Sequence, residues 1–229
     1  MKILALETST MLGGVAIADG HGLIAEIRLN VKTTHSERMM TAIDYALRQS
    51  DMTLDEIDAV AVASGPGSFT GLRIGLSTAK GLCYAAAKPL VLVPTLEACA
   101  WNFPYCVHPV CIMLDARKGE VYAATFRWER DGFMTIVSAR SISPEDVLTD
   151  CSGPVVLAGE GVIRYRDRII SAAAEMAIIA PSHKMVPSPS NVALLGLQKA
   201  LRSEFADAAT AEPLYIRRSE AEVKWSEKQ

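Results

Sequence analysis

The sequence lacks the grouped side chains from which most metal sites are built. Its 229 residues include four histidines and five cysteines, but no His-x-x-x-His pair and no Cys-x-x-Cys pair. Transition metals bind where such ligands are clustered, so we expect no zinc or iron site. The odd number of cysteines, several of them in apolar runs, indicates buried, reduced thiols and not a disulfide framework.

Long apolar runs and an excess of positive charge are also absent. No hydrophobic stretch approaches the about 18 residues that cross a membrane, and the N-terminus has no signal-peptide pattern. The 23 basic and 26 acidic residues leave a formal net charge of −3, and no basic stripe runs through the chain. A protein that binds nucleic acid by itself usually carries a basic face, so we expect any such contact to go through a partner. These absences predict a cytoplasmic protein without membrane contact.

The most informative stretch that is present is SGPGSFTGLRIGLSTAK, residues 64–80. It follows a nearly continuous apolar run at residues 57–63, typical of a strand buried on both faces, and leads into a helix of small residues. Ser68 and Thr70 are suited to cap that helix, whose free N–H groups can bind an anion or the backbone of a partner. The spacing matches neither a Walker A loop nor a dinucleotide fingerprint, and an ordinary strand-to-helix turn is the alternative. The motif loop, a candidate for docking or anion binding, comprises Gly65, Pro66, Gly67, Ser68, Phe69, Thr70, Gly71 and Arg73.

Two helices expected in the first half of the chain are unusually apolar. One begins after the capping-box sequence THSE at residues 34–37 and carries an apolar face between residues 39 and 47. The other, from about residue 71 to 87, is small or apolar nearly all round, and a helix of that kind must be covered. Core packing is the simpler explanation for each face, whereas adjacent methionines also suit a protein–protein surface.

The order of elements at the start of the chain recurs in its second half. LALETSTMLGGVAI (residues 4–17) and CIMLDARKGEVYAATF (residues 111–126) each have an apolar run, an acid, a turn with glycine and a second run. This pattern predicts a duplicated α/β unit with two lobes, residues 1–100 and 101–229, whose C-terminal segment can pack back on the first lobe. The two acids, Glu7 and Asp115, are placed to flank a cleft and hold magnesium or a water. Solvated turn carboxylates are the alternative.

The sequence resembles the TsaB (YeaZ) family from residue 1 to about residue 222. The resemblance rests on GPGSFTGLRIG, LALETST, DARKGEVYAA and PLYIRRSEA. It implies a duplicated actin/Hsp70-like ATPase (ribonuclease H-like) fold, in agreement with the half-repeat. It also implies a role as the non-catalytic subunit in bacterial tRNA threonylcarbamoyladenosine synthesis.

The resemblance further implies that the chain is a scaffold and not an enzyme. Thr95 and Cys99 stand where the catalytic paralogue TsaD carries a His-x-x-x-His metal pair. Glu160 lies in AGEG, where TsaD closes its nucleotide site with an Ala-Gly-Gly turn, and its carboxylate would repel a phosphate unless a cation intervened. We therefore expect no catalytic residue, no metal site and no cofactor of its own, while a nucleotide at the interface with the partner stays open.

The implied partners are a TsaD-like catalytic subunit, a TsaE-like ATPase, and tRNA only through the complex. Alone, the same apolar surface is expected to form a homodimer. The resemblance places the partner contacts on the two apolar helices, at Met39, Met40, Ile43, Leu47, Leu72, Leu76, Ala79 and Leu82. The motif loop would set the docking geometry, or Arg73 would reach an anionic group across the interface. The alternative function is a free-standing ATP-dependent enzyme of the same fold that uses Glu7 and Asp115 around a nucleotide.

Overall fold

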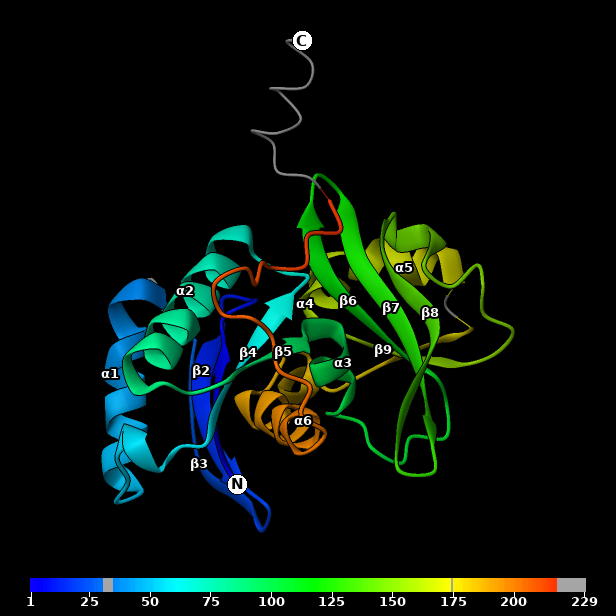
Figure 1. The fold of residues 1–229 in the computed structure, drawn as a ribbon. Coiled ribbons are helices and arrows are strands. Elements are labelled where there is room, and N and C mark those ends of the chain that lie inside the picture. The colour runs from blue at the N-terminus through cyan, green and yellow to red at the C-terminus, as the bar shows by residue number, and fades with distance from the viewer. Residues whose placement is uncertain (31–34, 174, 218–229) are drawn as a thin grey trace.

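The computed structural model describes residues 1–30, 35–173 and 175–217. Two five-stranded sheets lie side by side, with helices packed on their faces (Figure 1). The strands are β1 (Lys2–Glu7), β2 (Gly13–Asp19), β3 (Gly22–Leu29), β4 (Ala59–Gly65), β5 (Leu90–Pro94), β6 (Val110–Arg117), β7 (Glu120–Glu129), β8 (Gly132–Ile142), β9 (Val155–Ala158) and β10 (Ala177–Ile179). The helices are α1 (His35–Gln49), α2 (Phe69–Ala86), α3 (Thr95–Ala100), α4 (Glu160–Arg164), α5 (Arg166–Ala173) and α6 (Pro189–Leu201), with 3₁₀ turns η1 (Leu54–Glu56), η2 (Pro144–Asp146) and η3 (Ser182–Lys184).

The two sheets have the same topology, which confirms the duplicated α/β fold that the sequence pattern predicted. The first has the strand order β3-β2-β1-β4-β5, and the second, taken from its other edge, has the order β8-β7-β6-β9-β10. In each sheet the first three strands form an antiparallel meander. The fourth strand then runs parallel to the first, and the fifth parallel to the fourth. The capping box expected before α1 begins at Thr34, which lies outside the described residues.

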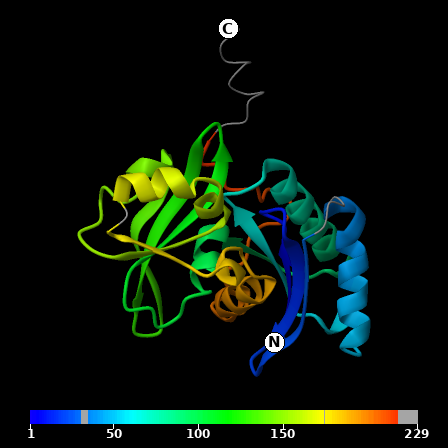
Figure 2. The same ribbon diagram turned by 180° about the vertical axis from the view of Figure 1, so that it is seen from behind.

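The first sheet is covered on both faces, and this explains why β4 reads as a nearly unbroken apolar run. Side chains such as Leu4 and Val60 pack toward α1 and α2, whereas the alternate positions Ala5 and Ala61 pack toward α6. A Cβ at Gly196 of α6 would lie 2.5 Å from the Cβ of Ala61, so the helix approaches the sheet closely. Both views show α6 between the two sheets (Figures 1 and 2). A helix from the second half of the sequence thus completes the core of the first sheet.

The second sheet buries its own core against α3, α4 and α5. Helix α3 also contacts β4, β5 and α6, so it packs against elements of both halves of the chain. Within the described ranges, no helix is long and apolar enough to cross a membrane.

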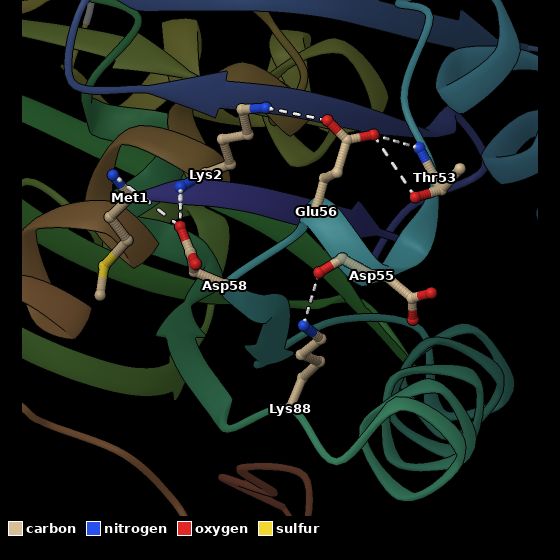
Figure 3. A network of polar contacts seen from close by, with 7 residues as sticks. All are labelled: Met1, Lys2, Thr53, Asp55, Glu56, Asp58 and Lys88. Atoms are coloured by element: carbon tan, nitrogen blue, oxygen red, sulfur yellow. Dashed lines mark hydrogen bonds and ion pairs between the residues drawn. The ribbon is translucent and has the colours of Figure 1, made fainter.

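A surface network ties the start of β1 to the segment that leads into β4 (Figure 3). The Lys2 N–H donates to Asp58 Oδ2 at 2.7 Å, and Lys2 Nζ lies 3.5 Å from Glu56 Oε1. Glu56 in turn accepts the N–H of Thr53 at 2.9 Å, and Lys88 Nζ donates to the carbonyl of Asp55 at 2.8 Å. Because β1 and β4 are parallel, their starts lie at one edge of the sheet, and this network closes that edge far from the motif loop.

Candidate functional site

The motif loop joins β4 to α2 at the opposite edge of the first sheet, and two other segments hold it there. The Gly65 N–H donates to Thr95 Oγ1 at 3.0 Å, at the start of α3. The Ser64 carbonyl accepts the N–H of Leu214 at 2.7 Å, so the C-terminal segment crosses directly over the loop. In Figure 1 this segment passes from α6 beside β5 and α2 toward the tips of β6 and β7. The loop is therefore a junction of segments that are distant in sequence.

Ser68 caps α2, as predicted, but Thr70 does not. Ser68 Oγ accepts the N–H of Gly71 at 3.3 Å, and the Ser68 N–H donates to the carbonyl of Ser9 at 2.7 Å. Thr70 lies one residue inside the helix, with an exposed side chain. The first turn is thus fastened to the loop that follows β1.

Two glycines of the motif are required by their surroundings. Gly65 has a φ of 115°, which L side chains rarely adopt, and a Cβ there would lie 2.7 Å from the carbonyl oxygen of Leu214. A Cβ at Gly71 would lie only 2.0 Å from the carbonyl oxygen of Thr8. Because both obstacles are backbone atoms, no side-chain rotation can relieve them.

The structure places most of the predicted partner-binding residues in the core. Met39 and Ile43 of α1 and three of the predicted α2 residues are buried against the chain's own first sheet, and Leu47 is half-buried on the same cluster. The fourth, Leu72, is buried beside Gly65 of the motif loop. The buried α2 residues are Leu72, Leu76, Ala79 and Leu82. Only Met40, 54% exposed, faces outward. The amphipathic pattern had identified the inward face of each helix, so we revise the expected contact set to the opposite face.

The outward face of α1 and α2 is the free surface beside the motif loop. Figures 1 and 2 show the two helices side by side on the face of the first sheet away from α6. On α2 the exposed positions follow helical spacing at Arg73, Ser77, Gly81 and Tyr84, and Tyr84 is 90% exposed. On α1, Tyr45 is 57% exposed. The helix expected to be covered all round is therefore covered on one side only, and the spacing 73-77-81-84 is the sequence signal that would have identified its free face.

Arg73 lies at the motif-loop end of this face, in contact with two aromatic rings. Its guanidinium carbon is 3.9 Å from the ring centroid of Phe69, and its Nε donates to the hydroxyl of Tyr215 at 3.0 Å. The rings of Phe69 and Tyr215 are stacked, with centroids 5.1 Å apart. Tyr215 lies in the motif PLYIRRSEA, but nothing in the sequence pattern paired it with Arg73, which is 142 positions away.

Glu7 is a buried acid, not a solvated turn carboxylate. It ends β1 with no exposed surface, and its Oε1 accepts the N–H of Ser9 at 2.6 Å and the Ser9 hydroxyl at 2.5 Å. Its Oε2 has no hydrogen-bond partner within the described part of the chain. Burial raises the pKa of Glu7 from 4.5 to about 7, although the Ser9 bonds and Arg28 act to lower it.

Asp115, the acid of the second half, is already occupied by neighbouring side chains. Its Oδ1 accepts the hydroxyl of Tyr165 at 2.9 Å and the N–H of Arg117 at 3.0 Å. Its Oδ2 lies 3.5 Å from Arg117 Nη1 and 3.6 Å from Arg164 Nε. Burial, followed by the charge of Asp115, raises the pKa of Glu160. No group of three or more His, Cys, Asp or Glu side chains able to hold a metal ion is found among the residues that the structure describes.

Thr95 and Cys99 both point into the protein. Thr95 is buried, and its hydroxyl is engaged by Gly65. Cys99 is completely buried, and that burial strongly raises the pKa of its thiol.

Comparisons with known proteins connect this chain with tRNA threonylcarbamoyladenosine biosynthesis. The family model described as "TsaD: tRNA N6-adenosine threonylcarbamoyltransferase" matches residues 22–225. The tRNA threonylcarbamoyladenosine biosynthesis protein TsaB of Bacillus subtilis (strain 168) is 32% identical to this chain, covering 100% of both proteins. The solved structure of YeaZ from Pseudomonas aeruginosa superimposes with a TM-score of 0.81 at 26% identity, covering 93% of this chain and 99% of that one. A ROK hexokinase from Thermus thermophilus, with a TM-score of 0.50 at 11% identity over 87% of this chain and 100% of that one, shares the fold alone.

Proposed function

The chain belongs to the TsaB family, which acts in tRNA threonylcarbamoyladenosine biosynthesis, and from this membership we propose that it is a non-catalytic subunit that docks on and supports a TsaD-like catalytic subunit. The docking surface is the outward face of α1 and α2, defined here as Met40, Tyr45, Arg73, Ser77, Gly81 and Tyr84. The family has the fold of the actin/Hsp70-like ATPases. In this chain we propose that the fold serves as a scaffold for the catalytic subunit.

The observation that carries the proposal is the composition of this docking surface. Three large side chains with apolar surface stand exposed on two adjacent helices: Met40, Tyr45 and Tyr84. Aromatic residues and methionine are enriched at protein interfaces, and an exposed apolar patch marks a surface that a partner covers. Beside Tyr84, Gly81 leaves open space where a Cβ would meet nothing within 4 Å. A helix of the partner can approach α2 closely there.

The buried environments of Thr95 and Cys99 support the non-catalytic part of the proposal. The Thr95 hydroxyl accepts a hydrogen bond that anchors the motif loop, and burial keeps the Cys99 thiol neutral. The carboxylates of the alternative function are equally unsuited to a nucleotide-bound cation, because Glu7 is enclosed and Asp115 is paired with two arginines. A free-standing ATP-dependent enzyme therefore remains the weaker candidate. It requires that the purified chain hydrolyse ATP with magnesium and no partner.

The proposal has further parts that follow from the family. A TsaE-like ATPase is a second partner, and tRNA is bound only through the complex, in the cytoplasm. In the absence of the catalytic subunit the docking surface forms a homodimer. Residues 1–100 form the partner-binding lobe and residues 101–229 the second lobe, whose C-terminal segment, including α6, packs back on the first. The protein has no cofactor of its own, and any nucleotide in the complex is bound at the interface with the partner.

A pair of glycine-to-arginine substitutions tests the docking surface. Gly81→Arg places a long side chain in open space, so the protein should stay folded, yet the chain should no longer form a complex with the TsaD-like subunit of the same organism in size-exclusion chromatography with light scattering. Gly20→Arg, which likewise places the arginine in open space but in the turn between β2 and β3, is the matched control and should bind as the unsubstituted chain does. Undiminished complex formation by the folded Gly81→Arg variant would show that this face is not the interface.

A further inference from the structure

The cluster of Phe69, Arg73 and Tyr215, called here the Arg73 cluster, contains an arginine held in one orientation. The guanidinium lies over the Phe69 ring at 3.9 Å and within 6.0 Å of the Tyr215 ring centroid. Its Nε is engaged by the Tyr215 hydroxyl at 3.0 Å. Neither Nη group has a hydrogen-bond or ion-pair partner among the residues that the structure describes. The two Nη groups, which with Nε give arginine its planar, two-pronged geometry for binding a carboxylate, are therefore oriented but have no bound group.

The second ring of the cluster is brought there by the C-terminal segment. The N–H of Leu214 is bonded to the Ser64 carbonyl, and the Leu214 carbonyl lies against Gly65, so the backbone beside Tyr215 is fixed on the motif loop. Two residues further on, Arg217 Nη1 lies 3.3 Å from Glu120 Oε2 of the second sheet. Tyr215 is thus anchored on both sides, and it reaches Arg73 as part of a built arrangement.

The charge around the cluster favours an anionic partner group. Helix α2 contains no acidic residue, and its two cations are Arg73 and Lys80. Lys80 donates to the carbonyl of Ala209, and Arg48 on the neighbouring α1 is paired with Asp44 at 3.0 Å. Stacking on aromatic rings orients a guanidinium without neutralising it. Arg38 on α1 donates to the carbonyl of Met11 at 3.0 Å. Among the residues that the structure describes, Arg73 is consequently the cation of the docking surface, as defined above, that is still available to a group from outside.

We propose that Arg73 binds a carboxylate of the subunit that docks on α1 and α2, and that Tyr215 is the residue that positions it. This inference rests on the proposed docking function. A protein carboxylate is favoured over a nucleic-acid phosphate because Arg73 is in helical register with Ser77, Gly81 and Tyr84 on the docking surface, and because the chain as a whole has a net charge of −3. The C-terminal segment thereby becomes part of the interface without leaving its own fold.

The test measures the Kd of the TsaD-like subunit of the same organism by titration calorimetry for three variants, over a series of salt concentrations. Arg73→Ala should weaken binding about 30-fold or more, since it leaves a partner carboxylate unpaired, and should flatten the dependence of log Kd on log salt. Arg73→Lys keeps the charge but loses the fork, so it should recover only part of the affinity. Tyr215→Phe keeps the ring but loses the bond to Arg73 Nε, and should weaken binding about fivefold.

The outcomes separate this inference from the docking proposal. An Arg73→Ala variant with unchanged Kd and salt dependence overturns the inference, and a lowered melting temperature with unchanged Kd would show that the cluster only fastens the C-terminal segment. If Gly81→Arg still abolishes the complex in that case, the docking proposal stands without it. If Gly81→Arg binds normally while Arg73→Ala does not, the docking surface as defined is refuted, and with it the inference that the carboxylate paired with Arg73 belongs to a subunit docked on α1 and α2. Full rescue by Arg73→Lys would show that a point charge suffices and would also refute the positioning role of Tyr215.

Discussion

Glu7→Gln should change how the stability of the protein depends on pH. The folded-state pKa of Glu7 is raised to about 7 from 4.5, chiefly by burial, so the folded protein keeps this proton at pH values where the unfolded chain has lost it. The native state is therefore destabilised as the pH rises from 4.5 to 7, and the loss is complete above pH 7. A shift of this size corresponds to about 3 kcal/mol.

Glutamine has no proton to lose, so it removes this pH dependence. It keeps an oxygen to accept the two Ser9 bonds, and it places an amide where Oε2 now has no partner among the described residues. That amide carries a cost that does not vary with pH. The free energy of unfolding of Glu7→Gln minus that of the unsubstituted protein should therefore increase by about 3 kcal/mol between pH 4.5 and pH 8, whatever its value at pH 4.5.

Urea unfolding followed by circular dichroism, repeated at half-unit steps of pH, measures this difference directly. Titrating groups that do not interact with Glu7 are common to both proteins and cancel, so the difference reports Glu7 together with its coupling to neighbours such as Glu160. Glu129→Gln, which removes a charge from an exposed position, is the control and should give a flat difference. A flat difference for Glu7→Gln as well would refute the conclusion that Glu7 is buried as a high-pKa acid.

The remaining predictions compare matched positions on α2. Leu76→Ala removes a buried side chain and should lower the free energy of unfolding by about 2–5 kcal/mol, whereas Tyr84→Ala on the outward face should change it by less than about 0.5 kcal/mol and instead weaken docking. Similar losses of stability in urea titrations would mean that the face of α2 has been assigned wrongly. Gly71→Ala drives a methyl group into the Thr8 carbonyl and should cost about 1–3 kcal/mol, whereas Gly81→Ala should stabilise the helix by about 0.5–1 kcal/mol. Equal effects at the two glycines in the same assay would contradict the close approach of α2 to the loop after β1.

Local sequence determined the elements and the kind of fold. The apolar run at residues 57–63 became β4, because a strand covered on both faces has no need of polar alternation. The repeated order of runs, acids and turns became two sheets of identical topology. Ser68 at the N-cap followed from the capping chemistry of one hydroxyl and one backbone N–H, both near in sequence. In each case the interactions that decide the outcome are local or periodic.

Tertiary structure alone decided which surface is free and how the acids behave. An apolar stripe indicates that one face of α1 or α2 is covered, but it does not indicate what covers it. In the structure the chain's own sheet covers the face of α2 that carries Leu76, whereas Tyr84 on the opposite face is exposed. Glu7 became a buried acid with Arg28 and Glu160, both distant in sequence, near enough to act on its titration, which no property of its own neighbours in sequence required. Arg73 met Tyr215 because the C-terminal segment returns across the motif loop. Contacts between distant segments depend on how the two sheets and their helices pack, and a single sequence carries no local signal for that packing.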